Sequence, residues 1–462
     1  MHRVSWLFIL LLAWESSAAL AANPRFETQD CPAPAAAAGA RCGVVQVPEN
    51  HANPRGRKIA LHVVVLPATG KRDGQRAQYD LEGGPGFAVT DFLGFYASDG
   101  AAYRETRDIV LADMRGTGLS NPLRCPAIEE TQRRQPTPAM YPAELVADCA
   151  KTLGGGNDLR QYTTGAAARD IDLVRRALGY EQLDLNAISY GTTLALRYIA
   201  DFPKAVHAAA LMGTVPASRT PPRFHAAAAQ VALDQLMAEC AADDRCRNNG
   251  DMRANLATAL ARVGTDTGVT APVFLEKVRT HLYVPASRVE LPYLLANASK
   301  GDFSKFVAPA GEGRVFADGL YLSITCTESF ARMNVDAAIA DARSTAFGAF
   351  RLERQRDACR QWPTGVADPR LMPEPDSRVP VLFIAGEHDP VAPADWAMDA
   401  GKHFANGRVI RVRHGAHVLD GLTELDTCLD PVMIRFFDSA SVRTLDVSCL
   451  AHMMPPAWGI PP

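Results

Sequence analysis

A serine near the middle of the chain, Ser189, stands where an apolar run changes into a helical pattern. The run Leu183–Ile188 predicts a buried strand, and the residues that follow, Ser-Tyr-Gly-Thr, open a helix. A strand that enters a small-x-Ser-x-Gly turn and then a helix is typical of a nucleophile elbow, which exposes the serine hydroxyl. The small residues on either side are Ala187, where glycine is usual, and Gly191. The motif predicts a nucleophilic serine, although an ordinary strand–helix turn remains the alternative.

A serine nucleophile needs a general base, and the base needs a carboxylate that fixes its tautomer. In this architecture the three follow along the chain in the order serine, acid, histidine. The run Val381–Ala385 predicts a strand whose following turn contains Asp389, and His417 lies past the next predicted strand. We therefore expect Asp389 and His417 to complete the site, with Glu387 and His414 as the competing residues. Two other histidines of this stretch are expected at the surface: His388 and His403.

A glycine-rich loop, Glu82–Gly86, follows the predicted strand Gln78–Leu81. Glycines allow backbone N–H groups to point at developing negative charge, as an oxyanion hole requires. Such a hole combines the N–H after the nucleophile, here that of Tyr190, with one from a loop of this kind. Gly84 is the first candidate for the second donor and Gly83 the second candidate. A hairpin turn is the alternative, and the spacing of a phosphate-binding loop is absent.

Short apolar runs alternate with helical patterns around these motifs, as in a doubly wound, mostly parallel α/β sheet. The predicted strands are Gly43–Pro48, Ile59–Pro67, Gln78–Leu81, Ile109–Asp113, Leu183–Ile188, Ala208–Met212, Val381–Ala385 and Val409–Val412. The predicted helices between them are Ala166–Leu178 and Thr192–Asp201. Side chains placed just past strand ends would meet at the ligand-binding edge of such a sheet.

A long alanine-rich segment interrupts this alternation and contains no convincing strand. Its predicted helices are Ala226–Cys240, Met252–Val263 and Leu291–Lys300. We expect a helical cap over residues 215–378, inserted between two parts of an α/β core at 22–214 and 379–462. The remaining residues, 1–21, are expected to form a signal peptide.

The N-terminus has the three parts of an export signal. Two basic residues, His2 and Arg3, precede the apolar run Val4–Trp14, and the small-x-small sequence Ala19–Ala21 follows. The run is too short to span a bilayer, and a buried helix is the alternative. No cysteine follows directly, so we expect no membrane anchor after cleavage. The protein is predicted to be exported, either to the periplasm or outside the cell.

Composition and cysteine usage fit an exported globular protein. The chain has 47% hydrophobic and 21% charged residues and a net charge of −3, which argues against a nucleic-acid partner. Its 10 cysteines form no CxxC pair, and only Cys449 and His452 approach metal-ligand spacing, so no metal is expected. In an oxidising compartment five disulfides between sequence neighbours are expected. These pairs are 31/42, 125/149, 240/246, 326/359 and 428/449.

Three motifs together resemble the family of proline iminopeptidases and tripeptidyl aminopeptidases. They are Gly83–Gly86, Asp113–Ser120 and Ser189–Thr192. The resemblance implies an α/β-hydrolase fold with a helical cap and a serine exopeptidase that needs no cofactor. It makes Ser189 the nucleophile, Asp389 the orienting acid and His417 the base, and it gives Asp113 and Arg115 structural roles. The exported branch of the family also has a cysteine-bearing C-terminal region, similar to residues 380 onward.

The resemblance also bears on the substrate. In the family, acidic side chains of the cap bind the free amino group of a peptide, and Cys326-Thr327-Glu328 resembles such a cap segment. Glu328 is therefore a candidate amine anchor, and the alternative is a solvated glutamate. Glu82, a further substrate-binding candidate, replaces a histidine of the iminopeptidases, so strict iminopeptidase specificity is not expected. The expected partners are peptides with a free N-terminus, while a carboxylesterase or lipase and a non-catalytic binding protein remain alternatives.

Overall fold

A sheet of nine strands forms the centre of the computed structural model, which describes residues 24–72, 75–134, 140–264, 267–307, 314–371 and 376–459. The predicted signal peptide lies outside these residues. The strands are β1 Phe26–Gln29, β2 Arg41–Pro48, β3 Lys58–Leu66, β4 Arg76–Leu81, β5 Asp108–Ala112, β6 Gln182–Ile188, β7 Val206–Met212, β8 Val381–Gly386 and β9 Gly407–Val412. Every predicted strand is present to within two residues at each end, and β1 is an additional edge strand.

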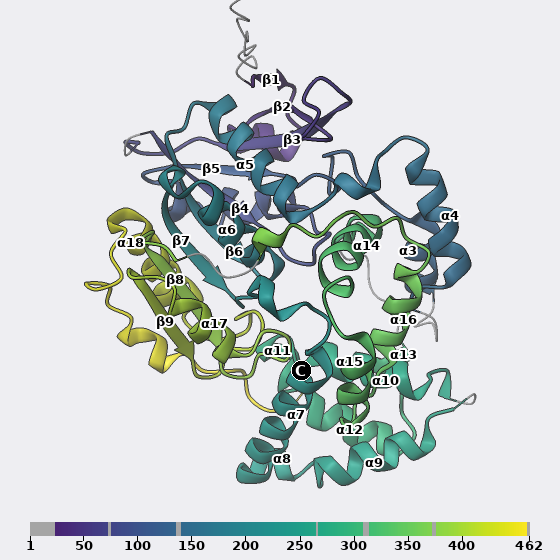
Figure 1. The fold of residues 1–462 in the computed structure, drawn as a ribbon. Coiled ribbons are helices and arrows are strands. Elements are labelled where there is room, and N and C mark those ends of the chain that lie inside the picture. Colours follow the sequence, from purple (N-terminus) through teal and green to yellow (C-terminus); the bar gives the residue numbers. More distant parts are fainter. Residues whose placement is uncertain are drawn as a thin grey trace, which may run out of the picture.

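The order of the strands across the sheet is β1-β2-β3-β5-β4-β6-β7-β8-β9. The strands pair antiparallel from β1 through β3 to β5 and parallel from β5 to β9. The predicted mostly parallel sheet is thus confirmed (Figure 1). Because β4, β6, β8 and β9 run in one direction, the turns that follow them meet at the same edge of the sheet.

Helices lie on both faces of the sheet, as a doubly wound sheet requires. They are α1 Ala33–Ala37, α2 Leu93–Ala97, α3 Pro126–Arg134, α4 Ala143–Gly154, α5 Thr164–Leu178, α6 Tyr190–Asp201, α17 Ala394–Gly401 and α18 Asp430–Ser439. Alternate residues of a strand point to opposite faces. In β8, Phe383 packs in the core beneath α5, α6 and α17, whereas Leu382 and Ile384 pack in the core beneath α1, α2 and α18.

The turn after β5 is held by two buried charged residues, Asp113 and Arg115, to which the family resemblance gives structural roles. Arg115 donates to both carboxylate oxygens of Asp170 on α5, at 2.6 and 2.7 Å. Asp113 accepts hydrogen bonds from the backbone N–H groups of Thr90 and Leu119, both at 3.1 Å. These contacts tie the turn to α5 and to the loop after β4, and neither side chain lines the cavity described below.

Between β7 and β8 the described residues form helices and no strand of the sheet. These helices are α7 His225–Ala242, α8 Asp244–Arg247, α9 Met252–Arg262, α10 Ala271–His281, α11 Pro285–Arg288, α12 Leu291–Ser299, α13 Ser304–Val307, α14 Asp318–Ile324, α15 Val335–Arg343 and α16 Phe350–Cys359. A π-helical turn, Thr325–Phe330, directly extends α14. We propose residues 215–378 as the extent of this cap, because β7 ends at Met212 and β8 begins at Val381.

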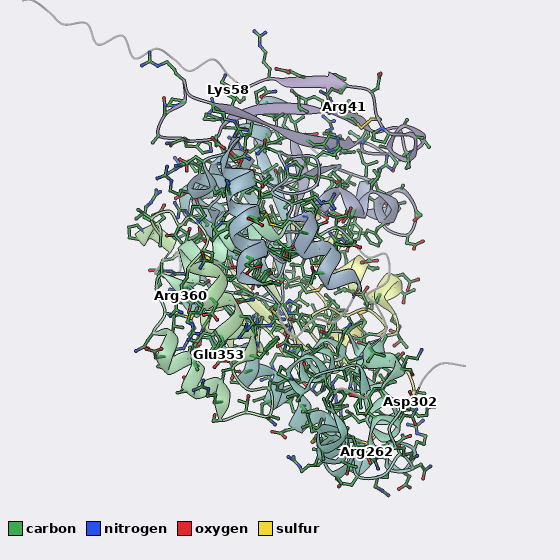
Figure 2. The ribbon with its side chains drawn as sticks, turned by 90° about the vertical axis from the view of Figure 1, so that its right-hand side faces the viewer. Arg41, Lys58, Arg262, Asp302, Glu353 and Arg360 are labelled. Carbon is green, nitrogen blue, oxygen red and sulfur yellow. A yellow bond between two sulfur atoms is a disulfide. The ribbon has the colours of Figure 1, made fainter. Side chains whose placement is uncertain are left out.

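The cap has a hydrophobic core of its own, formed mainly by α7, α9, α10 and α12. Figure 2 shows Arg262 and Asp302 of this region at the opposite end of the molecule from Arg41 and Lys58 of the antiparallel strands. The parallel part of the sheet therefore lies in the middle, where the cap covers the edge that carries Ser189.

Five disulfides link the pairs that were predicted from neighbouring cysteines. They are Cys31–Cys42, Cys125–Cys149, Cys240–Cys246, Cys326–Cys359 and Cys428–Cys449. Three of them join segments of the core, and Cys240–Cys246 and Cys326–Cys359 lie within the cap. In the part of the chain that the structure describes, no helix is long and apolar enough to cross a membrane.

Candidate active site

Ser189 occupies a sharp turn between β6 and α6, as its motif predicted. Its backbone has φ 55° and ψ −125°, a conformation that non-glycine residues avoid because of steric strain. A side chain at Gly191 would place a Cβ only 2.2 Å from the carbonyl oxygen of Leu81, so this position requires glycine. Ala187 is 2% exposed and is accommodated. The turn therefore holds the serine hydroxyl at the carboxyl edge of the sheet.

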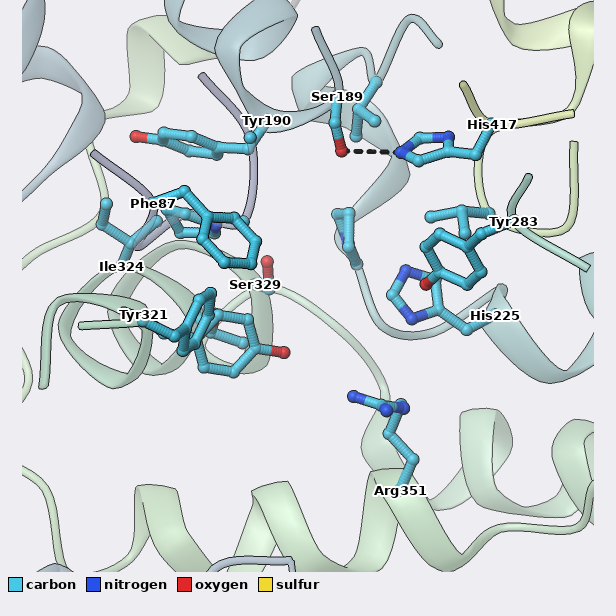
Figure 3. Close-up of a pocket in the computed structure, with 18 of the residues that line it drawn as sticks. Phe87, Ser189, Tyr190, His225, Tyr283, Tyr321, Ile324, Ser329, Arg351 and His417 are labelled. Atoms are coloured by element: carbon cyan, nitrogen blue, oxygen red, sulfur yellow. Dashed lines mark hydrogen bonds between the residues drawn. The ribbon is translucent and has the colours of Figure 1, made fainter. Parts of the chain in front are cut away.

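Asp389 and His417 reach Ser189 from the turns after β8 and β9. The Nε2 atom of His417 lies 2.8 Å from Oγ of Ser189, and its Nδ1 atom lies 2.8 Å from Oδ2 of Asp389 (Figure 3). The other carboxylate oxygen of Asp389 accepts the backbone N–H groups of Val391 and Ala392, both at 2.8 Å. These bonds fix the acid, which in turn orients the buried imidazole with its proton on Nδ1.

The two competing residues lie outside this arrangement. Glu387 is half-exposed and pairs with Arg411 at 3.7 Å, and neither Glu387 nor His414 lines the cavity above Ser189. His388, which was expected at the surface, is instead 8% exposed. Its ring contacts Glu239 of α7 at 3.0 Å, because the cap covers the turn after β8.

The glycine-rich loop after β4 lies against the nucleophile. A Cβ on Gly83 would come within 2.9 Å of the Ser189 Cβ, so the close approach depends on glycine. The backbone N–H of Gly83 donates to Oε1 of Glu82 at 2.6 Å. Gly84 has φ +114°, a conformation that suits glycine alone, and lies beneath the ring of Phe316. The loop thus brings its backbone close to the serine hydroxyl.

Arg314 of the cap holds this loop through the side chain of Glu82. It donates to Oε2 of Glu82 at 2.9 Å, to Asp91 at 2.8 Å and to the carbonyl of Ala88 at 2.7 Å. Its guanidinium also lies between the rings of two phenylalanines, Phe87 and Phe92. Both oxygens of Glu82 are therefore engaged within the protein.

A cavity of about 670 Å³ opens between the sheet edge and the cap, which is an ordinary volume for a small-ligand site. Ser189, Tyr190, Gly84 and His417 lie on its wall toward the sheet. Its apolar residues from the cap include Val273, Tyr283, Phe316, Tyr321, Ile324 and Phe350. Within the described residues, no group of three or more His, Cys, Asp or Glu side chains is placed to hold a metal ion.

Glu328 lines the same cavity from the π-helical turn, a kind of distortion that is common at functional sites. It is 5% exposed, which excludes the alternative of a solvated glutamate. Its carboxylate accepts the backbone N–H of Thr164 at 2.7 Å and the hydroxyl of Thr164 at 2.5 Å. Burial raises the pKa of Glu328, and the bonds from Thr164 and the charge of Arg332 oppose that shift.

Tyr283 is a cavity residue that sequence reasoning missed. Its ring meets the ring of His417 edge to face, with the centroids 5.4 Å apart (Figure 3). Its carbonyl accepts the backbone N–H of Val418 at 3.2 Å. The cap therefore buttresses the histidine loop directly, and a lone tyrosine after an amphipathic helix gives no sequence signal for this role.

A buried polar network supports the site from below. Asp80 of β4 accepts hydrogen bonds from Tyr96 at 2.5 Å, from Gln78 at 2.9 Å and from Asn186 of β6 at 3.3 Å. Burial raises the pKa of Asp80 to about 6, although these bonds favour its charged form. Asp80 therefore keeps its proton in the folded protein at pH values where an unfolded aspartate has lost it.

This shift predicts a specific pH dependence of stability. Between pH about 4 and about 6 the folded state binds one proton more than the unfolded state at Asp80, so the free energy of unfolding falls as pH rises. The loss is on the order of 3 kcal/mol over the window. Asp80→Asn should remove this slope, which urea unfolding of both proteins at a series of pH values will measure. The same slope in the variant would contradict the assignment.

A family model described as alpha/beta hydrolase fold matches residues 81–419, which span the glycine-rich loop and the whole Ser189, Asp389 and His417 arrangement. The chain belongs to the alpha/beta hydrolase fold family. The predicted fold is therefore confirmed for this α/β hydrolase.

Three curated relatives align over most of the hydrolase. A tripeptidyl aminopeptidase of Streptomyces coelicolor is 26% identical over 95% of this chain and 88% of its own. The serine protease Hip1 of Mycobacterium tuberculosis is 23% identical over 89% of this chain and 87% of its own. Carboxylesterase B of Mycobacterium tuberculosis is 27% identical over 89% of this chain and 86% of its own. The resemblance to tripeptidyl aminopeptidases that the motifs indicated is confirmed, and the protein is a serine hydrolase of the α/β fold.

Proposed function

We propose that this α/β hydrolase is an exported serine aminopeptidase that releases N-terminal residues or short peptides through an acyl-enzyme. The observation that carries the proposal is the buried carboxylate of Glu328 on the wall of the cavity that contains Ser189. A carboxylate of this kind suits a substrate that brings a positive charge into a partly desolvated site, because a buried ammonium must be paired. The free amino terminus of a peptide supplies such a charge.

The triad performs the chemistry in two steps. Ser189 Oγ attacks the carbonyl carbon of the scissile bond while His417 Nε2 takes the hydroxyl proton, and Asp389 stabilises the imidazolium that forms. The tetrahedral intermediate then collapses, the C–N bond breaks, and His417 returns the proton to the leaving amine. Water, deprotonated by the same histidine, hydrolyses the acyl-enzyme and restores Ser189.

The oxyanion of each intermediate would be bound by the backbone N–H groups of Tyr190 and Gly84. Tyr190 is the first residue of α6, and the first N–H groups of a helix have no acceptor within the helix. Of the two loop candidates, Gly83 already donates its N–H to Glu82 at 2.6 Å, which favours Gly84. This division of roles makes Glu82 and Arg314 supports of the loop.

Two acids of the cavity are candidates for the substrate ammonium. Both oxygens of Glu82 are bound by Gly83 and by the charged Arg314, whereas the two oxygens of Glu328 accept hydrogen bonds from the neutral Thr164. We therefore assign the ammonium to Glu328 first. Tyr190 lies between Glu328 and the nucleophile, since its hydroxyl is 2.9 Å from the hydroxyl of Thr164.

Export is supported by the disulfides. Five disulfides and no free cysteine among the described residues are typical of a protein that matures in an oxidising compartment. The N-terminal pattern of residues 1–21 indicates the same destination.

Hydrolysis of peptides with free and acetylated amino termini tests the proposed activity. We expect kcat/KM for a tripeptide p-nitroanilide to fall at least about tenfold on acetylation, because the buried carboxylate loses its charged partner. Hydrolysis of a small uncharged ester, measured in parallel, reports the activity of the triad without any contribution from ammonium binding. Equal rates for free and acetylated peptides would favour a carboxylesterase, the second candidate, which the 27% identity to Carboxylesterase B supports.

A further inference from the structure

Three positively charged side chains line one part of the cavity, and two of them share a single carboxylate. They are Lys277 and Arg279 of α10 and Arg351 of α16, and the carboxylate is that of Glu276. Arg279 donates to Oε2 of Glu276 at 3.0 Å, and Arg351 donates to the same oxygen at 2.5 Å. Among the described residues no carboxylate lies within ion-pair distance of Lys277. These four side chains together carry an excess of positive charge into the cavity.

The arginine of α16 keeps part of its guanidinium available. Its Nε and one terminal nitrogen donate to Glu276, and among the described residues the other terminal nitrogen has no hydrogen-bond partner. Figure 3 shows the guanidinium of Arg351 directed into the cavity from the wall opposite Ser189. An arginine with free donors presents the forked geometry that carboxylates bind.

A histidine of the cavity wall, His225, lies close to the same charges. Burial, together with the charges of Arg279 and Arg351, holds the pKa of His225 well below its usual value, so this ring is neutral. The remaining acid in this region, Asp318 at the start of α14, is a neighbour of Tyr141. The positive group is therefore built from the two helices of the cap, α10 and α16.

The position of this group relative to the triad decides which part of a substrate it meets. His417 delivers a proton to the leaving amine, so the leaving portion of a peptide lies on the His417 side of Ser189. Tyr283 packs on His417, and Arg279 lies over the ring of Tyr283 and donates to its hydroxyl. Figure 3 shows Tyr190 on the other side of Ser189, and Thr164, which contacts the hydroxyl of Tyr190, donates to Glu328. Arg279 thus lies on the leaving-group side of the nucleophile, and Arg351 faces the nucleophile from the opposite wall.

The distances set a limit on the length of the leaving portion. The ring centroids of His417 and Tyr283 are 5.4 Å apart, and the guanidinium carbon of Arg279 is 5.1 Å from the Tyr283 centroid. The centre of the imidazole and the carbon of that guanidinium therefore lie at most about 10.5 Å apart, which about three residues of extended chain cover.

We infer that Arg351, Arg279 and Lys277 bind a carboxylate on the leaving portion of the substrate, within about three residues of the scissile bond. The inference rests on the proposed aminopeptidase function and adds the substrate class: short peptides that carry positive charge at one end and negative charge beyond the cleaved bond. Both the C-terminal carboxylate and an acidic side chain offer the required group, and the experiment separates them.

Peptides that differ only at the C-terminus provide the test. We expect kcat/KM for peptides with a free carboxylate to exceed that of their C-terminal amides at least about tenfold, as for a charge-assisted hydrogen bond. The ratio should approach one when the leaving portion is longer than about three residues. An amidated peptide with glutamate in the leaving portion shows whether a side chain substitutes: recovery of the rate assigns the site to any nearby carboxylate, and no recovery assigns it to the terminal one.

Arg351→Gln tests the residue itself. Glu276 keeps its bond to Arg279 in this variant, so no buried carboxylate loses all of its partners. We expect the acid-to-amide ratio to fall toward one, with Arg351→Lys retaining part of it. Arg356→Gln, on the same helix but outside the cavity, is the matched control and should keep the ratio of the parent. Lys277→Met leaves no carboxylate without a partner and should also lower the acid-to-amide ratio.

Two results would overturn the inference. The first is a parent enzyme with the same kcat/KM for peptide acids and peptide amides at every length of the leaving portion. The second is an Arg351→Gln enzyme whose kcat/KM falls by the same factor for acids and for amides. Failure of the proposed function shows separately. The tripeptide p-nitroanilide has no carboxylate, so its response to acetylation of the amino terminus tests the aminopeptidase activity alone.

Discussion

Ser189→Ala is expected to lower kcat by about 10⁴-fold or more, because every covalent step passes through its Oγ. The same variant should no longer react with a serine-directed fluorophosphonate. Its thermal unfolding should remain close to that of the parent, since alanine fits the site of a small side chain. Normal labelling of the variant would show that the nucleophile lies elsewhere.

The two histidines that follow β9, His414 and His417, give a matched pair of variants for this experiment. His417→Ala removes the group 2.8 Å from the serine hydroxyl and should cost about as much as loss of the serine. His414→Ala removes a half-exposed ring outside the cavity and serves as the control. If the two variants exchanged outcomes, the base would be misassigned.

Glu328→Gln is expected to lower kcat/KM for peptides with a free amino terminus by a factor of roughly 30 to several thousand, since removal of one partner of a buried charge pair costs about 2–5 kcal/mol. The loss on a small uncharged ester should be at least about tenfold smaller, because no ammonium is bound. Burial raises the pKa of Glu328, so the free-amino activity of the parent should fall on the acid side as this carboxylate protonates. That part of the pH profile should be absent from the variant.

A second buried carboxylate supplies the control for this prediction. Glu49 is 5% exposed and ion-paired with Arg57, and it does not line the cavity. Glu49→Gln therefore measures the cost of altering a buried acid without touching the site. An equal loss on peptide and ester in the Glu328 variant would mean that the residue acts through folding and that the ammonium is bound elsewhere.

The sequence predicted best those features that depend on residues close together in the chain. The β6–Ser189–α6 turn needs small residues at fixed positions, and the structure shows the cause in the contact that Gly191 makes with Leu81. Chain order and the end of a strand narrowed the base to His417 or His414, the family resemblance favoured His417, and the distances in the structure support that choice. Neighbouring cysteines also paired as predicted, since short loops leave few alternatives.

The cavity's far wall was not predictable in the same way. Tyr283 and Arg351 lie on different segments of the cap, and only the packing of α10 and α16 brings them together. His388 was misplaced for a related reason: the sequence shows the turn after β8 but not that α7 covers it. Strand β1 was missed because four residues of mostly exposed edge strand carry no alternating pattern.

The disulfide Cys326–Cys359 joins the two parts of the cap that carry the proposed substrate contacts. Cys326 lies in the same π-helical turn as Glu328, and Cys359 ends the helix that begins beside Arg351. One covalent bond therefore restrains the spacing between the group assigned to the substrate's positive end and the group assigned to its negative end. In this view the bond helps to set the peptide length that the cavity accepts, and selection for length is acquired only when the two cysteines are oxidised.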